Sequence, residues 1–277
     1  MKQLILAAFS MCAFLVSNAQ QLKTPQPSTT TNVKQNFGLG SIELSYSRPN
    51  IKGRKIFGDL VPFDKVWRTG ANQATTLTFS DEVTIGGVKV PAGKYGLLAM
   101  PGATEWTFII TKQTDVTSPA AYKPEMDVVR VKATPMSLPW SVETMGISFE
   151  NIKDNNLELM VIWDKTMVFF PITTDVDTKV MKQIESVMKA DARPYFDAGA
   201  YYLENGKDLN QAVVWFDKAI DNNPKAFWVY YQKAKALAKL GKKTEAMAVS
   251  MKSMELAKDA KNDDYVALNE KLQKEMK

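Results

Sequence analysis

The chain has 277 residues, 45% hydrophobic, 10% aromatic and 23% charged, a composition that excludes wholesale disorder, collagen and a polytopic membrane protein. Its 35 basic and 30 acidic residues give a formal net charge of +5. They are spread along the chain without the basic stripe of a nucleic-acid-binding protein, so no nucleic-acid partner is expected. The chain has no histidine, which excludes Ser-His-Asp hydrolysis and histidine-ligated metal sites.

Residues 1–19 have the pattern of a secretory signal peptide. Lys2 supplies a positive charge, Leu4 to Val16 are mostly apolar, and Ser17 and Ala19 place small residues before the expected cut. The apolar stretch is shorter than a bilayer requires, and no later segment reaches about 18 consecutive apolar residues, so no membrane span is expected. We therefore expect an exported protein that is periplasmic or extracellular after cleavage near Ala19.

This cleavage would change the chemistry of the chain. It would remove Lys2, which lowers the formal charge from +5 to +4, and Cys12, which is the only cysteine. The mature chain would then lack both imidazole and thiol groups, and it has no calcium loop and no glycine-rich nucleotide loop. No metal and no cofactor are therefore expected. Residues 20–32 are rich in Pro, Ser and Thr and are expected to form a flexible leader.

Residues 33–175 have the pattern of an all-β domain. Ile42 to Tyr46 and Thr76 to Phe79 alternate between apolar and polar residues, and Gly86-Gly87 separates two short β-branched runs, which predicts a tight hairpin. Later runs are Tyr95 to Met100, Trp106 to Thr111, Val128 to Ala133, Val142 to Asn151, Leu157 to Trp163 and Met167 to Thr173. About nine or ten short strands predict an antiparallel β-sandwich or flattened barrel.

Residues 176–277 change to helical spacing and contain a repeat. Four pairs of similar residues lie 34 residues apart, namely Phe196 and Tyr230, Ala200 and Ala234, Leu203 and Leu237, and Ala212 and Ala246. This region resembles about two tetratricopeptide repeats, and a terminal helix is expected from Asp264 to Met276. The resemblance implies α-helical hairpins that bind a protein or peptide partner; the alternative is a helical support for the sandwich. The expected fold class is α+β, a sandwich followed by helical hairpins.

Unusual residues are densest between Ser47 and Thr75. Together with two later stretches they resemble the family called domain of unknown function 2911, over Val33 to Thr173. The motifs are Arg48-Pro49, Gly53-Arg54, Ile56-Phe57-Gly58, Trp67-Arg68, Gly70-Ala71-Asn72, Ala74-Thr75, Pro91-Ala92-Gly93, Tyr95 and Glu105-Trp106-Thr107. This resemblance implies a shared fold and an exported bacterial protein, with no activity to transfer.

Five residues of this region are candidates for ligand binding. Arg48, Arg54 and Arg68 carry planar donors suited to carboxylate or phosphate groups, while Trp67 offers a stacking face and Asn72 a directional amide. A small anionic or sugar ligand fits this set of groups. In the alternative interpretation, the same residues stabilise the loops, with the arginines paired to Asp59 and Asp64.

Two functions follow from these candidates. The first is an exported, non-catalytic binding or scaffold protein of the cell envelope. The alternative is a carboxylate-dependent hydrolase acting on glycans or cell-wall material, with Asp59 and Asp64 as acid and base. Such a pair must stand about 5–10 Å apart across the scissile bond.

Overall fold

The computed structural model describes residues 24–188 and 194–276. These residues form two compact units that divide between Thr174 and Asp175. The expected signal peptide and residues 20–23 of the expected leader lie outside the described residues. Among the described residues, no helix combines the length and apolar character needed to cross a membrane.

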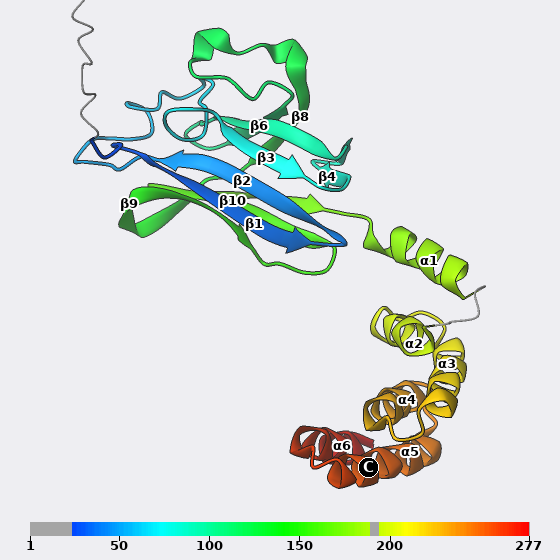
Figure 1. Ribbon diagram of the computed structural model, residues 1–277. Coiled ribbons are helices and arrows are strands. Elements are labelled where there is room, and N and C mark those ends of the chain that lie inside the picture. Colours follow the sequence, from blue (N-terminus) through cyan, green and yellow to red (C-terminus); the bar gives the residue numbers. More distant parts are fainter. Residues whose placement is uncertain (1–23, 189–193, 277) are drawn as a thin grey trace, which may run out of the picture. The chain divides into compact units, whose positions relative to one another are not determined.

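The first unit is a sandwich of two antiparallel sheets (Figure 1). The larger sheet has the order β1 (Thr29–Phe37), β2 (Gly40–Arg48), β3 (Thr75–Phe79), β6 (Gly93–Met100), β7 (Trp106–Thr111) and β8 (Asp127–Ala133). The smaller has the order β5 (Val88–Val90), β4 (Val83–Ile85), β10 (Asn156–Thr173) and β9 (Met136–Glu150). The antiparallel architecture expected from the sequence is confirmed, and one hydrophobic core lies between the sheets.

The hairpin at Gly86-Gly87 is also confirmed. Both glycines have positive φ, 56° and 79°, and Val83 pairs with Val90 and Ile85 with Val88. Because a two-residue turn of this kind needs left-handed backbone, the glycines set the register of β4 against β5.

One strand is longer than the sequence suggested. The runs Leu157 to Trp163 and Met167 to Thr173 belong to a single strand, β10, rather than to two. Its register against β9 shifts on both sides of Asp164, which has φ 50°. Buried residues fall at odd positions up to Trp163 and at even positions from Val168 onward. A bulge therefore breaks the alternation, which made one bent strand look like two.

The boundary of the leader needs a correction. Thr29 to Asn32 were assigned to the flexible leader, but they form the start of β1, with Thr29 paired to Arg48 and Asn32 to Ser45. The segment has three consecutive threonines, whose β-branched side chains favour extended backbone. Because β1 is the outer strand of its sheet, it needs few apolar residues, and the sequence therefore gave no hydrophobic signal there.

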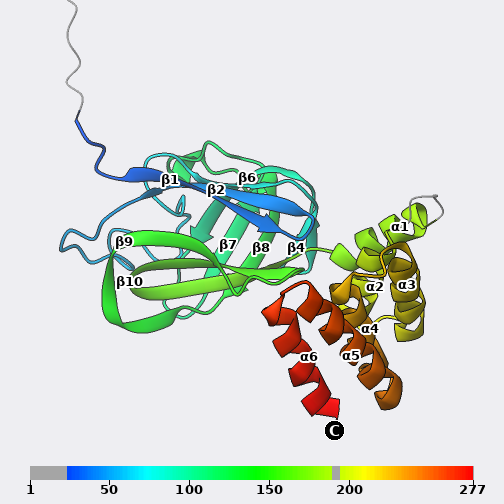
Figure 2. The same ribbon diagram turned by 60° about the horizontal axis from the view of Figure 1, so that its bottom comes forward.

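The second unit is α-helical (Figure 2). Its helices are α1 (Val176–Val187), α2 (Tyr195–Glu204), α3 (Leu209–Asn222), α4 (Phe227–Lys239), α5 (Lys243–Asp259) and α6 (Asp263–Met276). The pairs α2 with α3 and α4 with α5 are the two expected helical hairpins, and α6 is the expected terminal helix. Leu203, Leu237, Ala212 and Ala246, which lie 34 residues apart in pairs, are all buried. The small alanines let the helices approach closely.

Candidate functional site

The connection between β2 and β3, residues 49–74, builds the candidate site. It is anchored by Ile56, which is fully buried, and by Phe57, whose ring lies 4.9 Å from that of Trp106 and 6.2 Å from that of Trp163. These edge-to-face contacts fix the long connection to the sandwich core. It is therefore a packed part of the domain rather than a free loop.

The segment 67–72 is hydrogen-bonded both to β6 and within itself. The backbone of Trp67 exchanges two hydrogen bonds with Ala99, at 2.7 and 2.9 Å. The indole N–H of Trp67 donates to the carbonyl oxygen of Gly70, so this residue offers its ring face rather than its N–H to a ligand. Thr69 is buried with φ 53°, an unfavourable conformation for a β-branched residue. Strained backbone of this kind is concentrated at functional sites.

The backbone conformation and the surroundings of position 70 favour glycine. It has φ 154°, and a Cβ at this position would lie 2.9 Å from the carbonyl oxygen of Ser47. The adjacent amide of Ala71 donates to that same oxygen. Segment 67–72 therefore packs directly on the end of β2, which places Arg68 and Trp67 beside residues 49–54.

The three candidate arginines donate to backbone carbonyl oxygens. Arg48 donates to Met145, Arg54 to Ile51 and Asn50, and Arg68 to Thr117 at 2.6 Å, so all four acceptors are neutral backbone oxygens. Within the described part of the chain, none of these arginines forms an ion pair with an acidic residue. The expected alternative pairing with Asp59 and Asp64 is therefore wrong. The carbonyls orient the guanidinium groups but leave their charge uncompensated.

A cavity of about 320 Å³, here called cavity A, brings three of the five ligand-binding candidates together. They are Arg54, Trp67 and Arg68. The remaining residues of its wall are Pro27, Ser28, Pro49, Asn50, Lys52, Leu60, Val61, Gly70, Ala71 and Trp163. Three cations thus surround the cavity, and no described residue that lines it is acidic. The rings of Trp67 and Trp163 lie nearly parallel, 17° apart, with centroids separated by 6.1 Å.

The other two candidates lie outside cavity A. Arg48, on β2, donates to the carbonyl oxygen of Met145, on β9, and so links the two sheets. Asn72 lines a neighbouring hollow and donates to the carbonyl oxygen of Ser28, which holds the N-terminal segment beside the site. Both side chains therefore have structural partners, and the structure does not bring them to the same cavity as Arg54 and Arg68.

A second cavity of about 220 Å³, cavity B, shares a wall with cavity A. The shared residues are Leu60, Val61, Trp67 and Arg68. The rest of cavity B is lined by Pro62, Lys65, Val66, Val116, Thr117, Ser118 and Pro119. Both linings expose more apolar than polar surface; cavity A adds the cations Lys52 and Arg54 to the shared Arg68, and cavity B adds Lys65.

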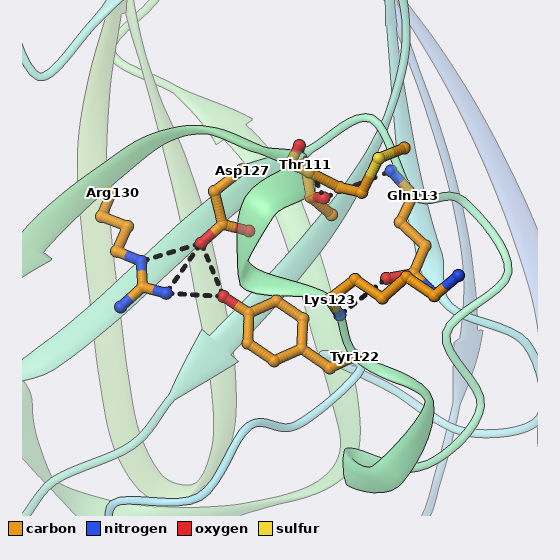
Figure 3. A network of polar contacts seen from close by, with 7 residues as sticks. Thr111, Gln113, Tyr122, Lys123, Asp127 and Arg130 are labelled. Atoms are coloured by element: carbon orange, nitrogen blue, oxygen red, sulfur yellow. Dashed lines mark hydrogen bonds and ion pairs between the residues drawn. The ribbon is translucent and has the colours of Figure 1, made fainter.

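A polar network holds the residues that follow 116–119 in the chain (Figure 3). The hydroxyl of Tyr122 donates to Asp127 and accepts from Arg130, which also donates to Asp127 at 2.8 Å. Burial, reinforced by the hydrogen bond to Asp127, raises the pKa of Tyr122 to about 12. Gln113 accepts from the backbone of Lys123 at 3.0 Å. The segment that carries residues 116–119 is thereby tied to β8 at its far end.

The two acidic candidates do not form a catalytic pair in either cavity. Asp59 and Asp64 are exposed, and neither lines cavity A or cavity B. The backbone of Asp64 donates to Pro101, and its carboxylate lies near Gly102. Within the described residues, no group of three or more acidic side chains gathers to hold a metal ion.

The sequence interpretation did not nominate Lys52 and Trp163, which stand in the wall of cavity A. Lys52 lies between the motifs Arg48-Pro49 and Gly53-Arg54. Its position in the turn from Asn50 to Arg54 was the signal that could have identified it as a candidate. Trp163 belongs to β10, almost a hundred residues further along the chain, and nothing in its local sequence pointed to the site.

Comparison with known families gives two matches. A family model described as "Protein of unknown function (DUF2911)" matches residues 28–172. A tetratricopeptide repeat model matches residues 215–248, which cover most of α3, all of α4 and the beginning of α5. No curated protein and no solved structure matches the chain.

Proposed function

The chain belongs to the DUF2911 family, and from this premise we propose that it is a non-catalytic binding or scaffold protein whose sandwich binds a small organic anion. The single observation that carries the proposal is the convergence of Lys52, Arg54 and Arg68 around Trp67 in cavity A, with no acidic residue among the described residues of its wall.

The chemistry of the wall supports an anionic ligand. A carboxylate or phosphate group accepts charge-assisted hydrogen bonds from guanidinium groups, and Arg54 and Arg68 are already oriented by backbone carbonyls. Side chains that are held in place before binding lose less entropy when a ligand binds. The indole ring of Trp67 adds an apolar contact for the body of the ligand.

The helical unit adds a second binding function to this proposal. Its match to a tetratricopeptide repeat suggests that it contacts another protein. The N-terminal pattern of residues 1–19 supports export, so the proposed place of action is the cell envelope. In this proposal the sandwich holds the anion and the helical hairpins hold a protein partner.

Isothermal titration calorimetry of the full chain with glucose 6-phosphate and with glucose tests the anion site. The two probes share a sugar ring and differ in the phosphate group. We expect glucose 6-phosphate to bind, glucose to bind much more weakly, and added sodium chloride to weaken the binding of the phosphate.

Variants connect the binding to cavity A. Arg54→Ala and Arg68→Ala should each weaken binding about tenfold to hundredfold, the value of a hydrogen bond to a charged group. Lys132→Ala is the matched control because Lys132 is an exposed cation that pairs with Glu105 and lines neither cavity. Equal binding of glucose and glucose 6-phosphate, or equal losses in all three variants, would refute the proposal.

A further inference from the structure

Cavities A and B share four lining residues, and cavity A holds two cations beyond the shared Arg68 where cavity B holds one. Leu60, Val61, Trp67 and Arg68 face both of them. Three of these four residues are apolar or aromatic, and Leu60 is an exposed side chain, with 43% of its surface accessible. The wall is therefore a surface over which an apolar group could lie while its charged end remains in cavity A.

The lining of cavity B suits an apolar group. Val116 is almost fully buried at its inner side, packed with Val66 in a small hydrophobic cluster of its own. Leu60, Val61, Pro62 and Pro119 complete the apolar surface. The cations of cavity B, Lys65 and Arg68, stand without an acidic residue among its described lining residues.

Arg68 connects the two compartments. Its Nη1 donates to the carbonyl oxygen of Thr117, in the wall of cavity B, while its Nε is buried and has no hydrogen-bond partner among the described residues. A buried donor without an acceptor costs about 1–3 kcal/mol, and such groups call for an explanation in a folded protein. Arg68 thus keeps one unsatisfied donor beneath the shared lining, and among the described residues no ion pair compensates its charge.

The compartments are also held in place. The hydrogen bond from Arg68 to Thr117 fixes residues 116–119 on one side, and the network of Tyr122, Asp127 and Arg130 fixes the following segment on the other (Figure 3). Cavity B is thus part of the folded domain, with a lining built from two segments that lie some fifty residues apart in sequence.

We propose that the ligand is an amphipathic organic anion, whose charged group lies among Lys52, Arg54 and Arg68 in cavity A and whose apolar chain passes over Leu60 into cavity B. This inference rests on the proposed anion-binding function and adds the chemical class of the ligand. The combined volume of the two cavities suits a short apolar chain rather than a long acyl chain.

Straight-chain carboxylates of increasing length test the inference. The full chain is titrated with acetate, butanoate, hexanoate and octanoate, and binding is followed by calorimetry and by tryptophan fluorescence, since Trp67 faces both cavities. Each methylene group that enters cavity B should tighten binding about fourfold, the value of one buried CH₂ group. Octanol, which has the same chain without the charge, should bind at least about tenfold more weakly than octanoate.

Two variants separate the compartments. Leu60→Ser should flatten the dependence on chain length, whereas Arg54→Ala should weaken all four carboxylates by a similar factor. Leu39→Ser is the matched control because Leu39 is also an exposed leucine, in the turn between β1 and β2, that lines neither cavity. This control should behave like the unchanged chain.

The outcomes distinguish this inference from the function on which it rests. Equal affinity for all four carboxylates, with glucose 6-phosphate still bound through Arg54 and Arg68, would overturn the amphipathic ligand and leave the anion site. Equal binding of octanol and octanoate, or no binding of any anion, would overturn both. A chain-length dependence that Leu60→Ser leaves intact would place the apolar group elsewhere and so overturn the inference alone.

Discussion

Gly199 in α2 lies directly against the ring of Phe216 in α3. A Cβ built on Gly199 would stand 2.9 Å from Cε1 of Phe216, closer than real Cβ contacts come. Phe216 is itself fully buried and belongs to the core between the first two helices of the repeat region. The ring of Phe216 thus fills the space that a side chain at position 199 would need.

Enlarging Gly199 should therefore destabilise the helical unit. We expect Gly199→Leu to lower the free energy of unfolding by about 1–3 kcal/mol through overpacking against Phe216. Urea unfolding followed by far-ultraviolet circular dichroism measures the change. Lys218→Leu, at an exposed position of α3, is the control that adds the same side chain without a buried clash. If Gly199→Leu were as stable as the unchanged chain, Phe216 would have to move aside for the larger side chain without loss of stability, and the prediction would be wrong.

The ends of α4 and α5 give a matched pair of turn variants. Gly241 and Lys261 each follow the C-cap residue of a helix, Leu240 and Ala260, and are left-handed, with φ 76° and 54°. A non-glycine residue is disfavoured there. Lys261→Gly should raise the free energy of unfolding by about 0.5–1 kcal/mol, and Gly241→Ala should lower it by a similar amount. Thermal unfolding of both variants checks the prediction, which fails if both shift the midpoint in the same direction.

A buried polar network joins α5 to α6. Asn269 is fully buried, donates to Ser253 at 2.9 Å and to the carbonyl of Tyr265 at 2.7 Å, and accepts from Ser250 at 2.9 Å. Asn269→Leu should cost about 1–3 kcal/mol because it leaves buried hydroxyl groups with fewer partners.

The double variant Ser250→Ala with Asn269→Leu tests this reason. Removing the hydroxyl as well should recover part of the lost stability, since one unsatisfied polar group is then absent. Urea unfolding of the two single variants and the double variant gives the coupling. Strict additivity would indicate that Asn269 acts through its volume alone.

Tyr122 makes the stability of the sandwich sensitive to alkaline pH. Burial and the hydrogen bond to Asp127 raise its pKa from 10.0 to about 12. The folded state therefore favours the neutral phenol, and this contribution is fully present below pH 10 and is lost as the pH rises through about 12.

Comparison with Tyr122→Phe isolates this effect from the titration of lysines. The difference in urea midpoint between the two proteins should change as the pH rises from 10 toward 12, and the difference in phenolate absorbance should show one group titrating near the upper value. Parallel loss of stability in both proteins across this range would mean that Tyr122 ionises as freely in the folded state as in the unfolded one.

The order of the units and their fold class followed from periodicity, because alternation with period two and spacing of 34 residues are properties of local sequence. The joining of two runs into β10 did not follow, since the bulge at Asp164 breaks the alternation. The start of β1 at Thr29 was missed because an outer strand carries little apolar signal.

The candidate site was predictable to the extent that its residues are close in sequence. Arg54, Trp67 and Arg68 were nominated for their donor and stacking chemistry, and the structure brings them to one cavity. Trp163 and the apolar wall at Val116 come from distant segments, so only the fold places them there. The carbonyl partners of the arginines could not be predicted either, because every residue has a backbone carbonyl and the residue type does not indicate which one accepts.

Pro27 and Ser28 stand in the wall of cavity A, and Asn72 holds the carbonyl of Ser28. Any purification tag, reporter or surface linker fused directly upstream of them would therefore emerge beside cavity A. Affinity handles and immobilisation chemistry for the experiments above belong after α6, at the opposite end of the chain.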